Sequence, residues 1–296
     1  MEGIRYHIPV MSEETIEYLN LKRGMTVVDA TIGTGGHALH ILKKILPTGL
    51  LIGIDKDSES LEVAKERLRE FGDNIKFIHG DFKDIDLLLK RIDIYKVDGI
   101  FFDLGLSMYQ LSNPERGFSF QSNGPLDMRI DRQSFISAYD LVNNLNEEEI
   151  SNLLWRFGQE KRHNRIARLL VKERQKKPIQ TTQELARLIA QLGGGFHYRI
   201  HPATRTFQAL RIAVNRELEV LKDGLNKVLD LLNPEARIVI ICFHSLEDRI
   251  VKQFFRKFAA EERVKIITKK PLCPSYEEIV KNPSARSAKM RVAEKL

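Results

Sequence analysis

Val27-Val28-Asp29-Ala30-Thr31-Ile32-Gly33-Thr34-Gly35-Gly36-His37 is the stretch of this 296-residue sequence that decides the fold. An apolar run breaks there into a glycine-rich turn, and a second apolar run, 50–54, ends at Asp55. Strand, glycine turn, helix and strand form a βαβ unit, in which glycines let the backbone approach a ligand closely. A carboxylate at the end of the second strand can accept both hydroxyls of a ribose. The stretch therefore predicts a nucleoside-binding α/β fold.

Short apolar runs and helical patterns alternate in two parts of the sequence. The first part has predicted helices at 37–46 and 58–71 and predicted strands at 25–29, 50–55, 75–79 and 97–103. The second part begins with one long helix from Pro202 to Val228 and continues with strand 237–243, helix 245–258 and strands 264–268 and 288–292. This order is typical of a mostly parallel sheet with crossover helices, so the fold class is α/β.

The block between these two parts, residues 104–200, contains no convincing strand. Residues 114–132 are rich in Gly, Pro, Ser and Asn and predict an ordered loop. Three helices follow, of which one is capped by Asn146, one is basic and covers 161–175, and one opens with a capping box at Thr181.

These boundaries predict one discontinuous domain with an insertion. The sheet domain covers residues 1–110 and 201–296, and the helical insertion covers residues 111–200. The last helix of the insertion is expected to end near the glycines at 193–195. Trp155 and Phe157 are expected in the insertion's own core.

Composition narrows the class of protein further. The chain is 43% hydrophobic and 29% charged, which is ordinary for a globular protein. Its longest uninterrupted apolar run, 238–243, is far shorter than the roughly 20 residues that cross a bilayer. Residues 1–5 lack the features of a signal peptide. Cys242 and Cys273 make neither a disulfide framework nor a metal site. We therefore expect a cytoplasmic protein with no membrane segment and no bound metal.

The net charge of +7 is unevenly distributed. Residues 1–103 hold 14 Lys and Arg against 18 Asp and Glu, whereas residues 104–200 hold 14 against 10 and residues 249–296 hold 13 against 5. The positive charge therefore lies outside the nucleoside-binding half, where a polyanionic substrate could dock. Residues 161–177 contain eight cationic side chains and one acid, Glu173. This density favours contact with RNA phosphates, and a merely solvated helix face is the alternative.

Polar residues also follow the third and fourth predicted strands. Gly80-Asp81-Phe82 follows the third, and Asp103-Leu104-Gly105 follows the fourth. An open α/β sheet binds its ligand at the carboxyl ends of its strands, and an acid beside an aromatic residue suits the edge and face of adenine. This pattern is the class I methyltransferase arrangement for S-adenosylmethionine. An NAD-dependent dehydrogenase is the enzymatic alternative, but a second mononucleotide-binding half is not evident.

Seven blocks of the sequence, spread nearly from end to end, form a far more specific signature than the glycine turn. They are His7-Ile8-Pro9-Val10-Met11, Asp29-Ala30-Thr31 through Gly35-Gly36-His37, Asp103-Leu104-Gly105-Leu106-Ser107, Glu115-Arg116-Gly117-Phe118-Ser119-Phe120, Gly124-Pro125-Leu126-Asp127-Met128-Arg129, Phe243-His244-Ser245-Leu246-Glu247-Asp248-Arg249 and Asn282-Pro283-Ser284-Ala285-Arg286-Ser287-Ala288-Lys289. Together they resemble the MraW/RsmH family. One departure is Met108-Tyr109, where the family more often has serine and a small residue before the glutamine matched by Gln110.

The resemblance implies a fold, an activity and partners. The implied fold is a class I, Rossmann-like methyltransferase with a mostly parallel seven-stranded sheet and an inserted all-helical domain for RNA recognition. The implied activity is S-adenosylmethionine-dependent methylation of N4 of a cytosine in the decoding region of 16S ribosomal RNA. The RNA would be met within the small ribosomal subunit or its precursor, and the chain could form a homodimer.

The resemblance also assigns residues to the cofactor site. Carried over by position, they are Gly35, Gly36 and His37 for the methionine end, Asp55 for the ribose, Phe82 for the adenine, and Asp103 and Gln110 beside the methyl group and target base. Two members of the glycine block have structural alternatives. Asp29 could be a strand-end turn former, and His37 could cap or pack against a helix.

The chemistry of methyl transfer suggests a catalytic role for Asp103. A sulfonium methyl is already activated, so the enzyme mainly aligns amine, methyl and sulfur. The N4 lone pair is delocalised into the cytosine ring, and an acceptor for the N–H protons makes N4 a better nucleophile. Asp103 is the candidate acceptor. Because the Pro-Pro-aromatic motif of many amino-methyltransferases is missing here, Tyr109, Phe118 and Phe120 are the candidates for stacking on an unpaired base.

Two further hypotheses complete the sequence interpretation. His244 and Ser245 are not expected to act as nucleophilic machinery, because no G-x-S-x-G elbow is present, and Ser245 is expected to cap the following helix. A non-catalytic RNA-binding factor of ribosome assembly, which merely retains the pocket, is the alternative function from another class.

Overall fold

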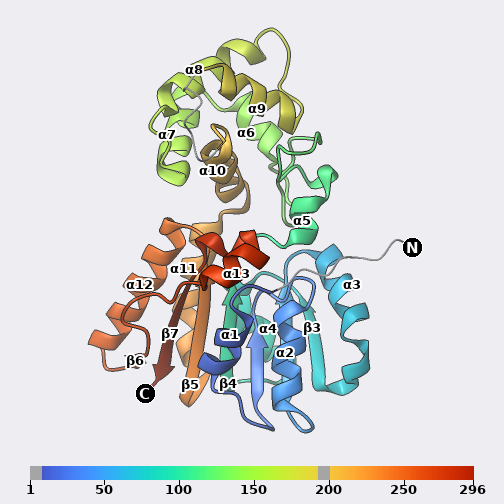
Figure 1. Ribbon diagram of the computed structural model, residues 1–296, viewed down its shortest axis with the longest axis vertical. Coiled ribbons are helices and arrows are strands. Elements are labelled where there is room, and N and C mark those ends of the chain that lie inside the picture. Colours follow the sequence, from blue (N-terminus) through green and yellow to red (C-terminus); the bar gives the residue numbers. More distant parts are fainter. Residues whose placement is uncertain (1–8, 193–200) are drawn as a thin grey trace. The chain divides into compact units, whose positions relative to one another are not determined.

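The computed structural model describes residues 9–192 and 201–296, which form two compact units (Figure 1). One unit comprises Met1–Ser107 and Leu218–Leu296, and the other comprises Met108–Glu217. The motif residues His7 and Ile8 and the glycines at 193–195 lie outside the described residues. Within the described ranges, none of the helices combines the length and apolar character needed to cross a membrane.

The first unit is built on a seven-stranded sheet, which confirms the predicted architecture. The strand order is β3-β2-β1-β4-β5-β7-β6, and β7 is antiparallel to β5 and β6 while the other neighbours are parallel. The strands are β1 (Thr26–Asp29), β2 (Leu50–Asp55), β3 (Ile75–His79), β4 (Val97–Asp103), β5 (Leu232–Cys242), β6 (Val264–Ile266) and β7 (Lys289–Lys295). The strand order reverses between β1 and β4, and such a switch point is where open α/β sheets bind ligands.

Helices cover both faces of this sheet (Figure 1). One buried core receives side chains from the helices α1 (Ser12–Leu19), α2 (Gly36–Ile45) and α3 (Ser58–Arg67). The other core receives side chains from α4 (Ile85–Lys90), α11 (Glu217–Leu231) and α12 (Ser245–Ala260). Val27 and Phe101 face the first core, whereas the next residue of each strand, Val28 and Phe102, faces the second. Because both faces are buried, the strands appear in the sequence as continuous apolar runs.

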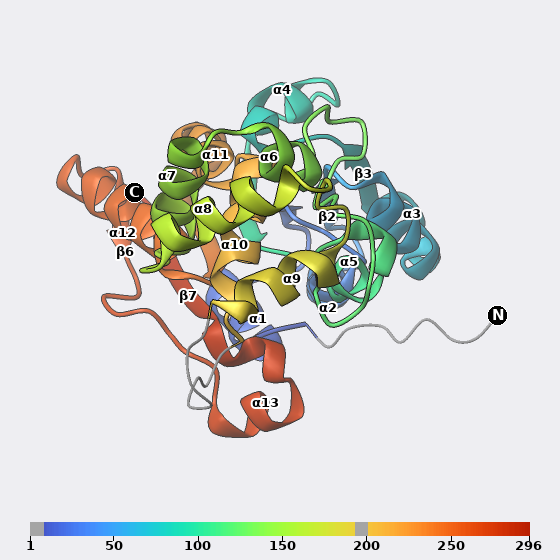
Figure 2. The same ribbon diagram turned by 90° about the horizontal axis from the view of Figure 1, so that it is seen from above.

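The second unit is helical. It contains α5 (Met108–Ser112), α6 (Ala138–Asn144), α7 (Glu147–Gly158), α8 (His163–Arg174), α9 (Thr182–Gln191) and α10 (Thr204–Asn215). Helices α8 and α10 both pack against α7 (Figure 2). Two predicted caps are confirmed, since Asn146 Oδ1 accepts the Glu149 N–H at 2.9 Å and Thr181 Oγ1 accepts the Glu184 N–H at 3.3 Å.

Short segments complete the chain around these two units. They are the helix α13 (Tyr276–Lys281) and the 3-10 helices η1 (Arg69–Asn74), η2 (Phe82–Asp84), η3 (Pro114–Arg116) and η4 (Pro283–Ser287).

The predicted long helix from Pro202 to Val228 was wrong. Arg216 adopts left-handed backbone angles (φ 50°, ψ 37°) and ends α10, after which α11 starts at Glu217. Because α10 packs on α7, it belongs to the helical unit. That unit therefore extends to Glu217 instead of ending at residue 200, and it begins at Met108 instead of residue 111.

Two smaller expectations were also wrong. The cap of α12 is His244, not Ser245, because the His244 ring accepts the Glu247 N–H while the Glu247 carboxylate accepts the His244 N–H. Trp155 does not lie in the core of the insertion, because its side chain is 55% exposed.

Candidate active site at the carboxyl edge of the sheet

Three aspartates lie at the carboxyl ends of β1, β2 and β4, beside the switch point. Asp29 ends β1, Asp55 ends β2 and Asp103 ends β4, and β1 pairs directly with both other strands. The parallel arrangement therefore brings three carboxyl groups from distant parts of the sequence to one edge of one sheet. Asp29 is almost completely buried.

The glycine turn is tied to the end of β2 by hydrogen bonds. Asp55 Oδ2 accepts the Gly33 N–H at 2.7 Å, and Asp55 Oδ1 accepts the Asp57 N–H at 2.9 Å. A carboxylate has about four acceptor positions, so Asp55 keeps capacity for the two hydroxyls of a ribose. Gly35 is the N-cap of α2 with φ 80°, a left-handed conformation that favours glycine. The N-terminus of α2 therefore opens directly from the turn.

Burial perturbs two of these carboxyl groups. It raises the pKa of Asp29 to about 7, against the opposing effects of His37 and of the Thr31 N–H. It also raises the pKa of Asp55 to about 6, against hydrogen bonds from the Asp57 and Gly33 amides. Carboxyl groups that titrate near neutral pH in one cluster are typical of functional sites.

His37 and Asp103 form the most unusual pair at this edge. The His37 side chain is 6% exposed, its ring packs against Phe101 with a centroid separation of 4.6 Å, and its Nε2 lies 3.4 Å from Asp103 Oδ2. Neither ring nitrogen of His37 nor Oδ1 of Asp103 has a hydrogen-bond partner within the described residues. Buried polar atoms without partners are rare in folded proteins. These atoms therefore indicate where a polar ligand belongs.

The remaining predicted cofactor residues, Phe82, Asp81 and Gln110, lie in three different surroundings. Phe82 is half-buried, and its ring meets Phe102 edge-on at 5.3 Å, so it is held on the second core of the sheet. Asp81, predicted to meet the adenine edge, accepts the Lys83 N–H at 3.1 Å and caps η2. Gln110 is buried on α5 of the helical unit. Of the predicted cofactor residues, Gln110 alone therefore lies outside the sheet unit.

Thr31 has a role that the sequence interpretation missed. Its Oγ1 accepts the backbone N–H of Asp103 at 2.7 Å and so joins the ends of β1 and β4 beside the His37–Asp103 pair. The signal was present in the glycine block, because a hydroxyl two residues after a strand-end Asp can bond a neighbouring strand. The guanidinium of Arg67 likewise donates to the Thr34 carbonyl at 3.3 Å and braces the glycine turn from α3.

In the helical unit, two of the predicted base-stacking residues are engaged inside the fold. Phe118 is buried, and Phe120 stacks on His201 at 4.5 Å and meets Phe207 edge-on at 5.0 Å. These rings are therefore not free to stack on a base in this conformation. Tyr109 is half-buried on α5.

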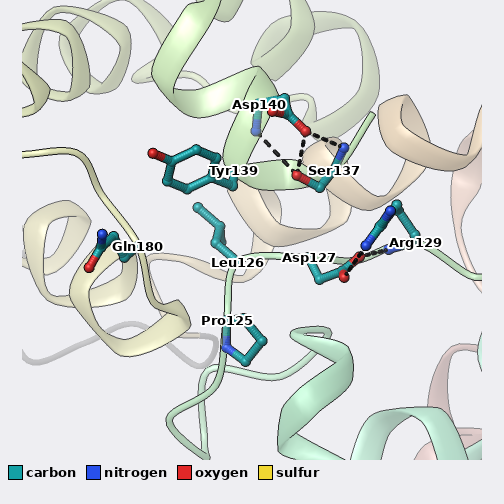
Figure 3. A pocket seen from close by; sticks show the side chains of 8 residues that line it. All are labelled: Pro125, Leu126, Asp127, Arg129, Ser137, Tyr139, Asp140 and Gln180. Atoms are coloured by element: carbon teal, nitrogen blue, oxygen red, sulfur yellow. Dashed lines mark hydrogen bonds and ion pairs between the residues drawn. The ribbon is translucent and has the colours of Figure 1, made fainter. Parts of the chain in front are cut away.

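The helical unit also contains a pocket of about 290 Å³, shown in Figure 3. Asp127 and Arg129 form a bidentate pair in its wall, with both N–O distances 2.8 Å, and Asp140 Oδ2 accepts from the amide and hydroxyl of Ser137. Burial works against ionisation of Asp127, but the hydrogen bonds from Arg129 outweigh it and lower the pKa of Asp127. Arg129 thus neutralises Asp127, and these hydrogen bonds brace the loop that precedes α6.

Comparison with known proteins gives close relatives over the full length. The chain is 45% identical over 306 residues to Ribosomal RNA small subunit methyltransferase H of Clostridium botulinum (strain 657 / Type Ba4), covering 98% of this chain and 99% of that protein. It is 48% identical over 295 residues to the protein of the same name from Persephonella marina, covering 98% and 99%. An rRNA methylase structure from Streptococcus thermophilus covers 99% of both chains at 11% identity, with a TM-score of 0.44.

The sheet order, the glycine turn and the strand-end carboxylates define a Rossmann-like methyltransferase. The chain belongs to the MraW methylase family, whose model matches residues 5–296. The resemblance seen in the sequence is thereby confirmed, and the dehydrogenase alternative is excluded.

Proposed function

We propose that this methyltransferase transfers the methyl group of S-adenosylmethionine to the N4 amine of a cytosine in the decoding region of 16S ribosomal RNA. The carrying observation is the pair formed by the buried His37 and the half-buried Asp103, whose unpartnered polar atoms lie beside the glycine turn. The names of the relatives, small-subunit rRNA methyltransferases, support the RNA as substrate.

The residues of the sheet unit fit this cofactor. Gly35 and Gly36 open α2 without side chains, and the unpartnered Nδ1 of His37 is available for a polar contact with the methionine end. Asp55 accepts the ribose hydroxyls, and Phe82 borders the adenine. When bound, S-adenosylmethionine supplies an activated methyl group on a sulfonium. Gln110 has its place in this site from the family resemblance alone.

In this proposal Asp103 receives the proton that the amine loses. Bound S-adenosylmethionine would supply the methyl group and leave as a thioether, and the Asp103 carboxylate would accept the one proton that N4 must lose. Oδ1 of Asp103 is the acceptor, because it lacks a hydrogen bond within the described residues. Thr31 fixes the backbone of Asp103, and His37 lies against its other oxygen, where it orients the carboxylate. Asp103 is the catalytic residue and His37 a positioning residue.

The RNA-binding part of the proposal concerns the helical unit and the basic C-terminal segment. The target cytosine must be unpaired or leave its stack, because base pairing would occupy N4. The substrate is the RNA within the cytoplasmic small subunit or its precursor. Two copies of the chain could act as a homodimer.

The test is methyl transfer to small subunits that lack the modification. Labelled S-adenosylmethionine is supplied, and nucleosides are digested and identified by mass. N4-methylcytidine is the expected product. Asp103→Ala should slow transfer by about 100-fold or more, the typical scale of general-base catalysis, while S-adenosylhomocysteine still binds in calorimetry. The exposed Glu66→Gln is the control.

Each alternative predicts a different result. Transfer to another atom of the RNA would replace the cytosine-N4 assignment. Absence of transfer despite cofactor binding would favour the non-catalytic assembly factor. Unchanged turnover in Asp103→Ala would remove Asp103 from catalysis without affecting the family assignment.

A further inference from the structure

Trp155 is an exposed aromatic side chain of the helical unit, near the end of α7 and shortly before the basic helix α8. It is the single tryptophan of the chain, it lies on α7, and its side chain is 55% exposed. Burying a tryptophan is strongly favourable in water. An indole this open leaves much of its aromatic face available to a partner.

The indole is held in a defined place by its neighbour on α8. The rings of Trp155 and His163 have centroids 5.3 Å apart. Nδ1 of His163 lies 2.7 Å from Ser151 Oγ, and that hydroxyl donates its proton to Asn164 Oδ1 at 2.6 Å. The imidazole is thus anchored, and it supports one side of the indole while the rest stays open.

Exposed cations predominate in the sequence that follows Trp155, whereas the exposed acids of α7, Glu148 and Glu149, lie in its first turn. From residue 152 to 172, a segment described throughout, the exposed side chains include no acid. Glu160 is buried, and its carboxylate lies 3.6 Å from Arg162. Arg168 pairs with Glu147 at 3.4 Å. The exposed cations of this segment are Arg156, Lys161, Arg165, Arg168 and Lys172.

An anchored, open aromatic ring among exposed cations fits single-stranded nucleic acid. Bases stack on aromatic side chains whatever their sequence, and cations neutralise the phosphates on either side. A folded protein partner would instead require a larger apolar face, and Trp155 is isolated among polar and charged residues. We propose that Trp155 is a stacking platform for an unpaired base of the substrate RNA, with Arg156, Lys161 and Arg165 on the adjacent phosphates.

This inference rests on the proposed function for the identity of the RNA. Trp155 takes the base-stacking role that the sequence suggested for Phe118, which is buried, and for Phe120, whose ring packs against His201 and Phe207.

The experiment uses the emission of the single tryptophan in the full chain. A single-stranded 20-mer RNA is titrated in, and the same strand annealed to its complement is titrated separately. The single strand should quench and saturate the emission, and the duplex should do so far less. Anisotropy of the labelled 20-mer then measures affinity in variants. Trp155→Leu should bind about tenfold more weakly, the scale of one lost stack, and Trp155→Phe should stay near wild type.

Tyr95→Leu is the matched control, because Tyr95 is 59% exposed and lies in the sheet unit, outside the basic C-terminal segment. The inference is overturned if emission does not respond to single-stranded RNA, or if Trp155→Leu binds as tightly as wild type. It is also overturned if only intact small subunits change the emission and their extracted RNA does not, since the face would then meet a protein. Methyl transfer is assayed in parallel. Wild-type transfer with no tryptophan response would sink this inference alone, and RNA-dependent quenching without transfer would sink the proposed function alone.

Discussion

At the scale of single residues, the ionisation of Asp29 should be visible in the stability of the protein. Burial raises its pKa to about 7 from an ordinary 3.8. Between these values the folded state holds a proton that the unfolded state has lost, so this group makes the unfolding free energy fall as pH rises from about 4 to 7. Asp29→Asn keeps the acceptor for the Thr31 N–H and cannot ionise. We expect the variant to be more stable than wild type at pH 8, by a few kcal/mol at most, and similar at pH 4.

Urea unfolding without cofactor at a series of pH values measures this difference. Asp55 also has a raised pKa, to about 6, so some pH dependence should remain below that value in the variant. The exposed Asp73→Asn serves as control and should keep the wild-type profile. An Asp29→Asn profile parallel to wild type between pH 4 and 7 would contradict a buried, titrating Asp29.

At the scale of elements, the junction between the glycine turn and α2 depends on one glycine. Gly35 has φ 80°, and an added Cβ would lie 2.9 Å from Leu68 Cδ1. Gly35→Ala therefore combines backbone strain of roughly 1 kcal/mol with a clash against α3's C-cap residue. We expect a loss of unfolding free energy of about 2–3 kcal/mol in urea denaturation, of which the clash is the larger part.

Gly33→Ala separates the two effects. Gly33 also has a positive φ, 51°, but an added Cβ would meet only ordinary contacts at 3.9 Å. Its loss of stability should therefore be the smaller one. Equal losses of unfolding free energy in both variants would show that the Leu68 side chain moves aside at little cost. The positive φ alone would then require a glycine at position 35.

The elements also show how far local sequence signals reach. The strands predicted at 50–55, 75–79 and 97–103 have the bounds of β2, β3 and β4, because each is a buried apolar run that a polar or turn residue closes. The prediction of one long helix was wrong because the apolar spacing continues on both sides of Arg216. A single residue with left-handed backbone angles does not change that periodicity. The prediction that Ser245 caps α12 was wrong because a histidine ring rarely serves as the capping acceptor, a role that Ser or Asp usually fills.

Some features of the candidate site could likewise be predicted from the sequence, and others could not. Sequence spacing was sufficient to predict that Asp55 and Asp103 end neighbouring or nearby strands at the same edge, because parallel strands share their direction. It could not predict that both ring nitrogens of His37 would be buried without partners, or that Trp155 would be exposed, because both depend on what the rest of the fold covers. Burial is a property of the tertiary structure, and so are the pKa values that follow from it.

At the scale of the whole molecule, the uneven charge predicts that salt weakens binding of RNA far more than binding of S-adenosylhomocysteine. Residues 1–103 carry a net −4 from 14 cations and 18 acids, whereas residues 249–296 carry a net +8 from 13 cations and 5 acids. Binding of single-stranded RNA releases about 0.7 counterion per neutralised phosphate. With about five phosphates neutralised, RNA affinity should fall about 100-fold between 50 and 200 mM KCl. Affinity for S-adenosylhomocysteine, which is bound by hydrogen bonds and burial, should change little.

Titrations of labelled RNA and of S-adenosylhomocysteine over the same salt series test this expectation. Arg165→Glu and Lys172→Glu, on the exposed face of α8, should each lower the slope of log affinity against log salt by at least about 0.7. Lys65→Glu, on α3 of the sheet unit, where the lysine already pairs with Glu62 at 2.7 Å, is the control and should leave the slope unchanged. If the α8 variants keep the full slope, the RNA is neutralised elsewhere, and the C-terminal segment, with the larger excess of cations, becomes the surface to examine by the same substitution.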